Sequence, residues 1–106
     1  MKTQGIIAEL RAAVYLKKHG YKIIHLHWRG GGGEIDIVAK ESGMFVLVEV
    51  KSSSRLGAGQ SRVDKRKMDH LRMAAAAFER EYQCKEYRFD IVEISDAGVH
   101  LIRGAF

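Results

Sequence analysis

The chain has 106 residues and a net charge of +5, with 46% hydrophobic and 29% charged residues. This length supports one hydrophobic core, so we expect a single domain over residues 1–106, and the lack of a long apolar run excludes a membrane-spanning protein. The basic balance favours a polyanionic partner, of which nucleic acid is the commonest. The single cysteine, Cys84, and the absence of a signal-peptide pattern predict a reducing, cytoplasmic compartment.

The N-terminal segment predicts an amphipathic helix followed by a strand. Residues 5–19 carry apolar side chains at helical spacing, and Gly20 stands where helices commonly end. The apolar stripe consists of Ile6, Ile7, Leu10, Ala13 and Val14. Residues 21–28 alternate in the manner of a strand. His25 and His27 share one side of it, but two histidines without a third ligand give little support to a zinc site.

The middle of the chain predicts a loop and a hairpin. Four glycines at 30–33 require a loop, and because no helix follows them, close backbone approach explains them better than phosphate binding. Residues 34–40 and 45–51 are rich in isoleucine and valine and predict two strands. Residues 41–44 then form the hairpin turn between them.

The second half predicts a polar loop, a long helix and two final strands. Residues 52–61 are polar and contain glycine, and residues 62–83 show the apolar stripe of a helix. That stripe consists of Val63, Leu71, Ala74, Ala75 and Phe78. The chain closes with strands over 87–94 and 99–103. The order is therefore α-β-β-β-α-β-β, which predicts an α/β fold with a mixed sheet flanked by helices.

Folding residues 34–51 into the hairpin brings four charged side chains together. The turn sets a register in which Asp36 faces Glu49 and Glu34 faces Lys51. Because side chains alternate along a strand, all four project from one sheet face. Two carboxylates directly opposite one another are destabilising unless a positive group lies between them.

A hard divalent cation would relieve this repulsion. Magnesium takes oxygen ligands, usually one or two carboxylates with waters and a substrate phosphate. Asp36 and Glu49 are therefore candidate ligands, and Lys51 would lie beside the ion to polarise the phosphate or steady an attacking water. These residues outline a site for phosphodiester hydrolysis. The alternative is a solvated charged face, which would place opposite charges, rather than two acids, across from one another.

Other charged residues allow two interpretations each. Lys67 falls inside the apolar stripe of the second helix, where it either snorkels to water or reaches a site carboxylate or substrate phosphate. Glu9 borders the apolar face of the first helix and is either a boundary residue or a further member of the acidic cluster. Asp90 is expected to be structural, pairing with Arg88 or a neighbouring loop. The basic outer face of the second helix either contacts nucleic acid or solvates the helix, and it consists of Arg62, Lys65, Arg66 and Arg72.

Several segments together resemble the YraN family of small bacterial proteins. They are Gly33–Val38, Phe45–Lys51, Lys67 with Leu71 and the alanine run, Arg88–Val92, and the closing Ala105–Phe106. They keep their order over nearly the whole chain. That family resembles the restriction-endonuclease-like, or PD-(D/E)xK, nuclease superfamily and is similar to archaeal Holliday-junction resolvases. The resemblance implies a mixed sheet with flanking helices, in agreement with the element order above.

Carried over by position, the resemblance implies a catalytic set. Its members are Glu9, Asp36, Glu49 and Lys51. Asp36 and Glu49 would bind the metal together with the carbonyl of Val50. Lys51 would be the catalytic lysine, and Glu9 would support the ion through water. Two further positions match the family in supporting roles, Glu34 and Lys67.

We therefore expect an endonuclease that depends on Mg²⁺ or Mn²⁺ and hydrolyses DNA phosphodiester bonds, with branched or structured DNA as a narrower expectation. Related resolvases pair their subunits, so the resemblance also implies a homodimer. The alternative is a non-catalytic module with a nuclease-like fold that binds nucleic acid or a protein partner.

Overall fold

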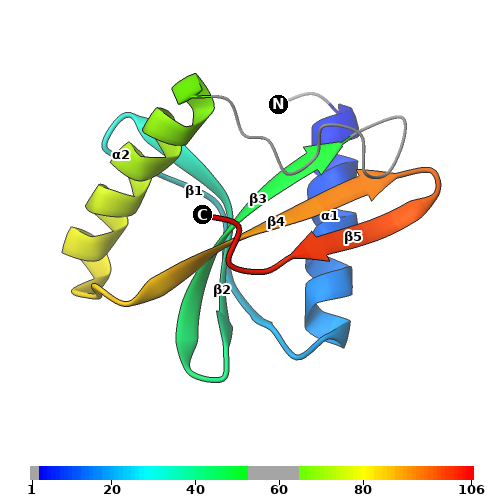
Figure 1. Cartoon of the computed structure of the whole chain (residues 1–106), viewed down its shortest axis with the longest axis horizontal. Helices are drawn as coiled ribbons and strands as arrows, with labels where there is room; N and C mark the ends of the chain where they lie inside the picture. Colours follow the sequence, from blue (N-terminus) through cyan, green and yellow to red (C-terminus); the bar gives the residue numbers. More distant parts are fainter. Residues whose placement is uncertain (1–2, 53–64) are drawn as a thin grey trace.

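The structure, a computed structural model, describes residues 3–52 and 65–106, which form two helices and five strands (Figure 1). In chain order these are α1 (Thr3–Lys18), β1 (Lys22–Gly30), β2 (Gly33–Glu41), β3 (Met44–Ser52), α2 (Lys65–Tyr82), β4 (Tyr87–Ser95) and β5 (Gly98–Ile102). The expected element order and α/β class are confirmed. Most of the predicted loop over 52–61, the predicted start of the second helix, and Arg62 lie outside the described residues.

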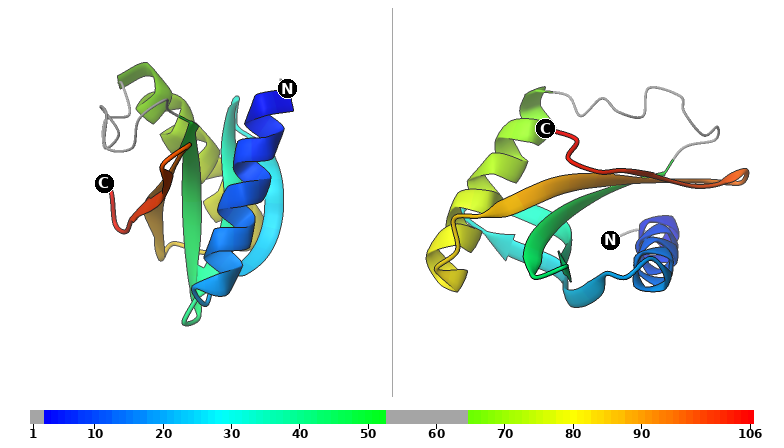
Figure 2. Two further views of the ribbon diagram at one scale, coloured as in Figure 1. Left: turned by 90° about the vertical axis from the view of Figure 1, so that its right-hand side faces the viewer. Right: turned by 60° about the horizontal axis from the view of Figure 1, so that its bottom comes forward.

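The described strands form one sheet in the order β1-β2-β3-β4-β5. β3 and β4 run parallel and the other neighbours run antiparallel, so the sheet is mixed as predicted. A parallel pair needs a crossover, and the chain between these two strands contains α2. Figure 2 shows α1 and α2 against opposite faces of the twisted sheet, and each helix packs on its own apolar cluster. Neither of these helices is both long and apolar enough to cross a bilayer.

The predicted hairpin between β2 and β3 has the expected turn and register. Ser42 and Gly43 have positive φ angles of 51° and 82°. Two successive left-handed residues form the tight turn whose twist matches that of the flanking strands. From this turn the ladder keeps the predicted register as far as the pair Ile37–Val48.

The buried face of α2 is the one that the sequence predicts. Its buried residues are Leu71, Ala74, Ala75 and Phe78. They pack on the sheet beside Trp28, Val38 and Leu47. The Phe78 ring meets the Trp28 ring edge-on, with 5.8 Å between the centroids, which is a favoured aromatic geometry.

The buried face of α1 differs from the predicted stripe. The bulky members of that stripe are 43–53% exposed, namely Ile6, Ile7, Leu10 and Val14. The residues that face the sheet are Ala8, Ala12, Ala13 and Leu16. Hydropathy favours the bulky side chains, but small side chains let the helix pack close to the sheet, and on α1 close packing determines the orientation. Glu9 consequently lies within the buried face, 4% exposed, and not at its border.

Close backbone approach explains the run of glycines, as predicted, but Gly30 ends β1 and Gly33 begins β2, so the loop is confined to Gly31 and Gly32. A Cβ on Gly33 would lie 2.1 Å from the carbonyl oxygen of His70, and one on Gly31 would lie 2.6 Å from that of Met73. The turn between β1 and β2 therefore lies against the backbone of α2 at a distance that only glycine permits. This contact determines where the N-terminal half of α2, which carries Lys67, lies relative to the strands.

A second charged cluster ties the C-terminal segment to β4. The carboxylate of Asp90 accepts hydrogen bonds from the Tyr21 hydroxyl at 2.7 Å, from Arg88 Nε at 2.8 Å and from the backbone N–H of Gly104 at 3.0 Å. Asp90 is 1% exposed, so these donors and the positive charge of Arg88 replace its lost hydration. These contacts confirm the structural role predicted for Asp90.

Replacing Gly33 by alanine should strongly destabilise the protein, because the new Cβ would clash with a helix carbonyl that cannot rotate away. Gly43 is the matched control, since a Cβ there meets nothing within 4 Å and only its positive φ opposes the change. We expect G33A to lose about 3 kcal/mol of unfolding free energy and G43A about 1 kcal/mol, measured by urea denaturation. Equal losses in the two variants would contradict the close approach.

Candidate active site

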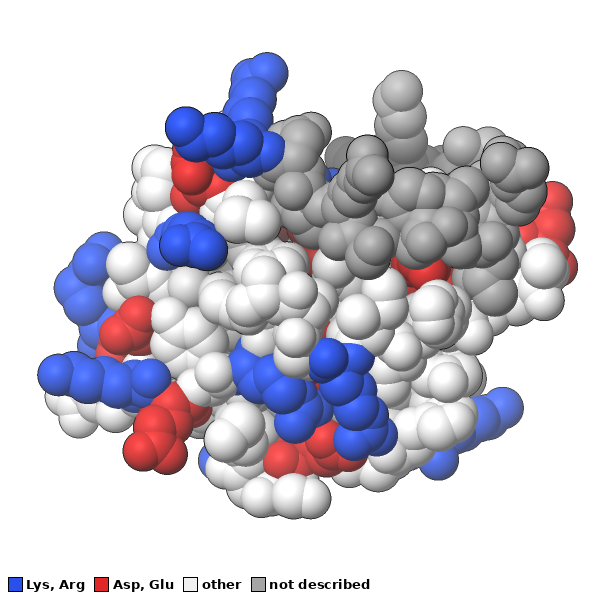
Figure 3. Space-filling view, viewed as in Figure 1, with Lys and Arg blue, Asp and Glu red and all other residues white. Residues whose placement is uncertain are grey.

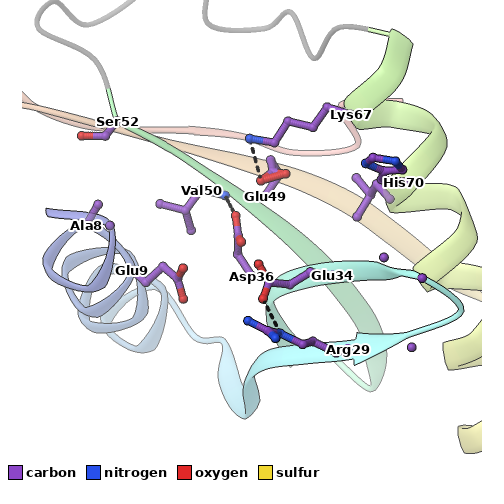
Figure 4. A pocket seen from close by; sticks show the side chains of 15 residues that line it. Ala8, Glu9, Arg29, Glu34, Asp36, Glu49, Val50, Ser52, Lys67 and His70 are labelled. Carbon is purple, nitrogen blue, oxygen red and sulfur yellow. Dashed lines mark hydrogen bonds and ion pairs between the residues drawn. The ribbon is translucent and has the colours of Figure 1, made fainter. Parts of the chain in front are cut away.

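A cleft of about 840 Å³ opens where the ends of β2 and β3 part between the two helices. The predicted charged residues that line it are Glu9 from α1, Glu34 and Asp36 from β2, Glu49 from β3 and Lys67 from α2 (Figure 4). Val50 also lines the cleft. The fold therefore gathers most of the residues singled out in the sequence around one cavity.

The ladder between β2 and β3 ends at the pair Ile37–Val48, one pair before Asp36 and Glu49, and the two strands part from there. The predicted pairing of these two acids across the ladder is wrong, and so is that of Glu34 with Lys51. The backbone N–H of Val50 instead donates to the Asp36 carboxylate at 2.8 Å. The Val50 N–H is thus bound by a side-chain carboxylate instead of a backbone carbonyl of the neighbouring strand. The carboxyl groups of Asp36 and Glu49 nevertheless meet, since hydrogen bonding to Asp36 is one cause of the raised pKa of Glu49.

Glu49 is buried beside both a like charge and an opposite charge. It is 5% exposed, and the ammonium of Lys67 lies 3.4 Å from its Oε1. Burial, and then hydrogen bonding to Asp36 and the charge of Asp36, raises the pKa of Glu49 well above its usual value, although Lys67 opposes the rise. Without a bound cation, Glu49 therefore holds a proton at neutral pH. The contact with Glu49 also confirms that Lys67 reaches a carboxylate of the cluster.

Glu9 approaches the same cluster from the opposite face of the sheet. Its carboxylate points towards Asp36 (Figure 4), and burial, followed by the charges of Asp36 and Glu34, raises the pKa of Glu9 to about 7. Its Oε1 lies 2.7 Å from Nε2 of His27, yet it accepts no aligned hydrogen bond from the described residues. Glu9 is therefore a member of the acidic cluster and not a boundary residue.

Lys51 lies beside a second buried acid. Strand alternation places Lys51 and Glu49 on one face of β3, but Lys51 is not among the described residues that line the cleft. Its neighbour in the ladder is Glu93 on β4, which is 1% exposed. One carboxylate oxygen of Glu93 lies 2.7 Å from Nδ1 of His100, and the other has no hydrogen-bond partner in the described part of the chain. The sequence pattern did not indicate Glu93, because isolated acids on strands are usually solvated.

Comparison of the sequence with known families identifies the group to which the chain belongs. The family model described as "Uncharacterised protein family UPF0102" matches residues 8–94. The chain belongs to this family. UPF0102 is the YraN family, so the resemblance found in the sequence is confirmed.

Two curated UPF0102 relatives match along almost their whole length. The UPF0102 protein of Sulfurihydrogenibium sp. (strain YO3AOP1) is 36% identical over 110 residues, which cover 99% of this chain and 96% of the relative. The UPF0102 protein of Moorella thermoacetica is 38% identical over 115 residues, which cover 99% and 96%. Every candidate site residue lies within the span that the family model matches.

A solved archaeal structure shares the fold of this UPF0102 protein. It is Hjc from Archaeoglobus fulgidus, described as a Holliday junction resolvase from an archaeal hyperthermophile. The TM-score is 0.65, and the similarity covers 95% of this chain and 73% of the resolvase chain, at 19% sequence identity. The predicted resolvase-like fold is therefore confirmed. A fold at this identity does not carry a function with it.

Basic side chains of the UPF0102 protein are spread among acidic ones on the face seen in Figure 3, with several along the side formed by α2. Lys65, Arg66 and Arg72 are exposed on α2. Their exposure agrees with both predicted roles, solvation of the helix and contact with nucleic acid. Arg29, which the sequence analysis did not indicate, lies on the rim of the cleft, and its Nε donates to Glu34 at 3.0 Å.

The donor set of the cleft suits a hard divalent cation. Asp36, Glu49 and Glu9 present only oxygen atoms, and Oε1 of Glu9 is buried without an aligned donor. Magnesium in proteins often binds through one or two carboxylates and keeps several waters. Within the described ranges no group of three or more His, Cys, Asp and Glu side chains is arranged to hold a metal ion by itself. Two carboxylates completed by water and backbone oxygen are the arrangement that these residues fit.

The stability of the metal-free protein should fall as pH rises from 4.5 through 7 and beyond. The folded-state pKa values of Glu9 and Glu49 lie above the value of 4.5 for the unfolded chain, so the folded state holds protons that the unfolded chain releases. Ionisation therefore costs nothing below pH 4.5 and destabilises the fold progressively above it. We expect the melting temperature in EDTA to show this fall, and E49Q to melt above wild type at pH 8.

Asp90 provides the matched control for E49Q, because it is an equally buried acid whose donors are all in place. D90N should melt below wild type at the same pH, with a loss of about 3 kcal/mol. If E49Q and D90N were destabilised alike, the acids of the cleft would be ordinary structural carboxylates.

Proposed function

We propose that this UPF0102 protein is a metal-dependent endonuclease that hydrolyses DNA phosphodiester bonds. One observation carries the proposal: Glu9, Asp36 and Glu49 are crowded into one cleft, where burial raises the pKa values of Glu9 and Glu49. Crowded carboxylates weaken a fold unless a cation compensates them, and such perturbed groups cluster at functional sites.

Asp36 and Glu49 would hold Mg²⁺ or Mn²⁺, with the carbonyl of Val50 as a third protein ligand. When bound, the ion would supply the positive charge that stabilises the phosphate oxygens as the reaction proceeds. Glu9 would orient the attacking water from the α1 side, accepting a hydrogen bond from it. Lys51 would steady the same water or the phosphate.

Lys67 would contact the substrate at the mouth of the cleft. Its side chain is half exposed, and its ammonium, 3.4 Å from Oε1 of Glu49, favours the ionised form of that carboxylate. A metal ion on Glu49 would take over that role and leave the ammonium able to bind a phosphate. Glu34 lines the rim, and basic residues at and just before the start of α2 in the sequence would add contacts to the DNA backbone, namely Arg62, Lys65 and Arg66.

Branched or structured DNA is the narrower part of the proposal. The net charge of +5 supports a nucleic-acid partner. The similarity in fold to a protein described as a Holliday junction resolvase favours a junction as the first substrate to test. The homodimer expected from the resemblance stays a prediction that analytical ultracentrifugation would check.

The test is cleavage of labelled four-way junction, flap, single-stranded and linear duplex DNA, each with Mg²⁺, Mn²⁺ or EDTA. Wild type should cut at least one substrate only with metal, and D36N should cut at least about a hundredfold more slowly, because it loses a ligand. D69N, which neutralises an exposed acid on α2, is the matched control and should cut like wild type.

The rival function is a non-catalytic module that binds nucleic acid or a protein partner. The exposed apolar residues of α1, Ile7, Leu10 and Val14, are the observation that favours a protein partner. Binding of DNA without cleavage under any metal would favour this module and reject the endonuclease. Cleavage that survives D36N unchanged would reject the proposed site.

A further inference from the structure

His27 has a backbone conformation that strands rarely contain. Its φ is +54° in the middle of β1. Residues other than glycine seldom adopt the left-handed region, although asparagine, aspartate and histidine do so more often than most. Local strain of this kind persists only where the surrounding structure imposes it, and it concentrates at functional sites.

The left-handed residue marks the point where the β1–β2 hairpin changes face. Leu26 pairs with Ile37, and Trp28 pairs with Ile35. In a regular strand, residues two apart share a face. Ile37 nevertheless belongs to the apolar cluster under α1, whereas Ile35 and Trp28 belong to the cluster under α2. The hairpin therefore turns over between these two pairs, and the residues between them are His27 on β1 and Asp36 on β2.

The imidazole of His27 lies between two acids of the cleft. Its Nε2 is 2.7 Å from Oε1 of Glu9, and its Nδ1 is 3.5 Å from Oε2 of Glu34. The His27 side chain is 33% exposed, while that of Glu9 is 5% exposed, so the ring approaches the buried carboxylate from the solvent side. No described residue, His27 included, donates an aligned hydrogen bond to Oε1 of Glu9, and among the described residues the His27 ring is the polar group in contact with it.

We propose that His27 is a positioning residue of this site, which holds the Glu9 carboxylate in the orientation that faces Asp36. The inference rests on the proposed endonuclease function, in which Glu9 orients the attacking water. The left-handed backbone sets the direction of the ring, and the ring sets the direction of Glu9. His27 does not line the cleft that holds Asp36 and Glu49, so it acts through Glu9 and not on the substrate.

The test compares H27A and H27N with wild type on the DNA substrate that wild type cuts best. H27A should lower kcat by about 10–100-fold, the usual effect of losing a partner that orients a site residue, while KM for DNA changes little. H27N should recover part of the loss, because asparagine tolerates the left-handed backbone and keeps a donor. H25A is the matched control, since His25 lies exposed on the same strand, and it should behave like wild type.

A double-mutant cycle in thermal stability tests the contact without relying on activity. H27A, E9A and the double variant should show non-additive changes in melting temperature, because each single change removes the same interaction. Additive changes would overturn the proposal, and so would an H27A protein with wild-type kcat or a loss confined to KM. If wild type cut no DNA at all, the endonuclease proposal would fail, whereas the cycle would still decide whether His27 holds Glu9.

Discussion

The crowding of three carboxylates in one cleft is the constraint around which the rest of this structure is arranged. Glu9, Asp36 and Glu49 come from three different elements and are each removed wholly or partly from water. Their compensation is incomplete: Lys67 contacts Glu49 from 3.4 Å, and the N–H of Val50 contacts Asp36. Asp90, which pairs with Val48 in the ladder between β3 and β4, shows what complete compensation looks like, with a guanidinium, a hydroxyl and a backbone N–H around one carboxylate. Asp90 is therefore a carboxylate that stabilises the fold, whereas the three carboxylates of the cleft lack such compensation.

The three carboxylates come together because one helix lies on each side of the point where β2 and β3 part. α1 turns its alanines to the sheet and so brings Glu9 close to Asp36. α2 lies against the glycine loop, with the Gly33 backbone touching the His70 carbonyl, and so brings Lys67 to Glu49. The separation of the strands provides a cleft where a cation and a phosphate can enter.

Local patterns in the sequence predict much of this arrangement. The glycine at position 43 predicts the turn and hence the register of the hairpin, which the structure keeps as far as Ile37. The position of Lys67 within an apolar stripe indicates a partner for its charge, and the structure provides Glu49. The orientation of α1 was not predictable in the same way, because hydropathy ranks Ile7 and Leu10 above the alanines, while packing on a sheet prefers small side chains.

Contacts between residues that are distant in the sequence were not predictable from sequence patterns. The end of the ladder before Asp36 results from a side chain that captures a backbone N–H, which alternation cannot indicate. The left-handed conformation of His27 and its contact with Glu9 join residues that are 18 positions apart. As one of two histidines on a strand, His27 suggested at most a metal ligand.

The most direct measurement is calorimetric titration of the metal-free protein with Mg²⁺ near pH 7, in two buffers with different ionisation enthalpies. Because Glu49 holds a proton when no cation is present, binding of the ion should release that proton, and the heat should differ between the buffers. D36N should bind far more weakly. Proton release that disappears in D36N would establish the cleft as a cation site. Absence of binding by wild type, or binding with no proton release, would contradict a carboxylate cluster kept for a metal ion.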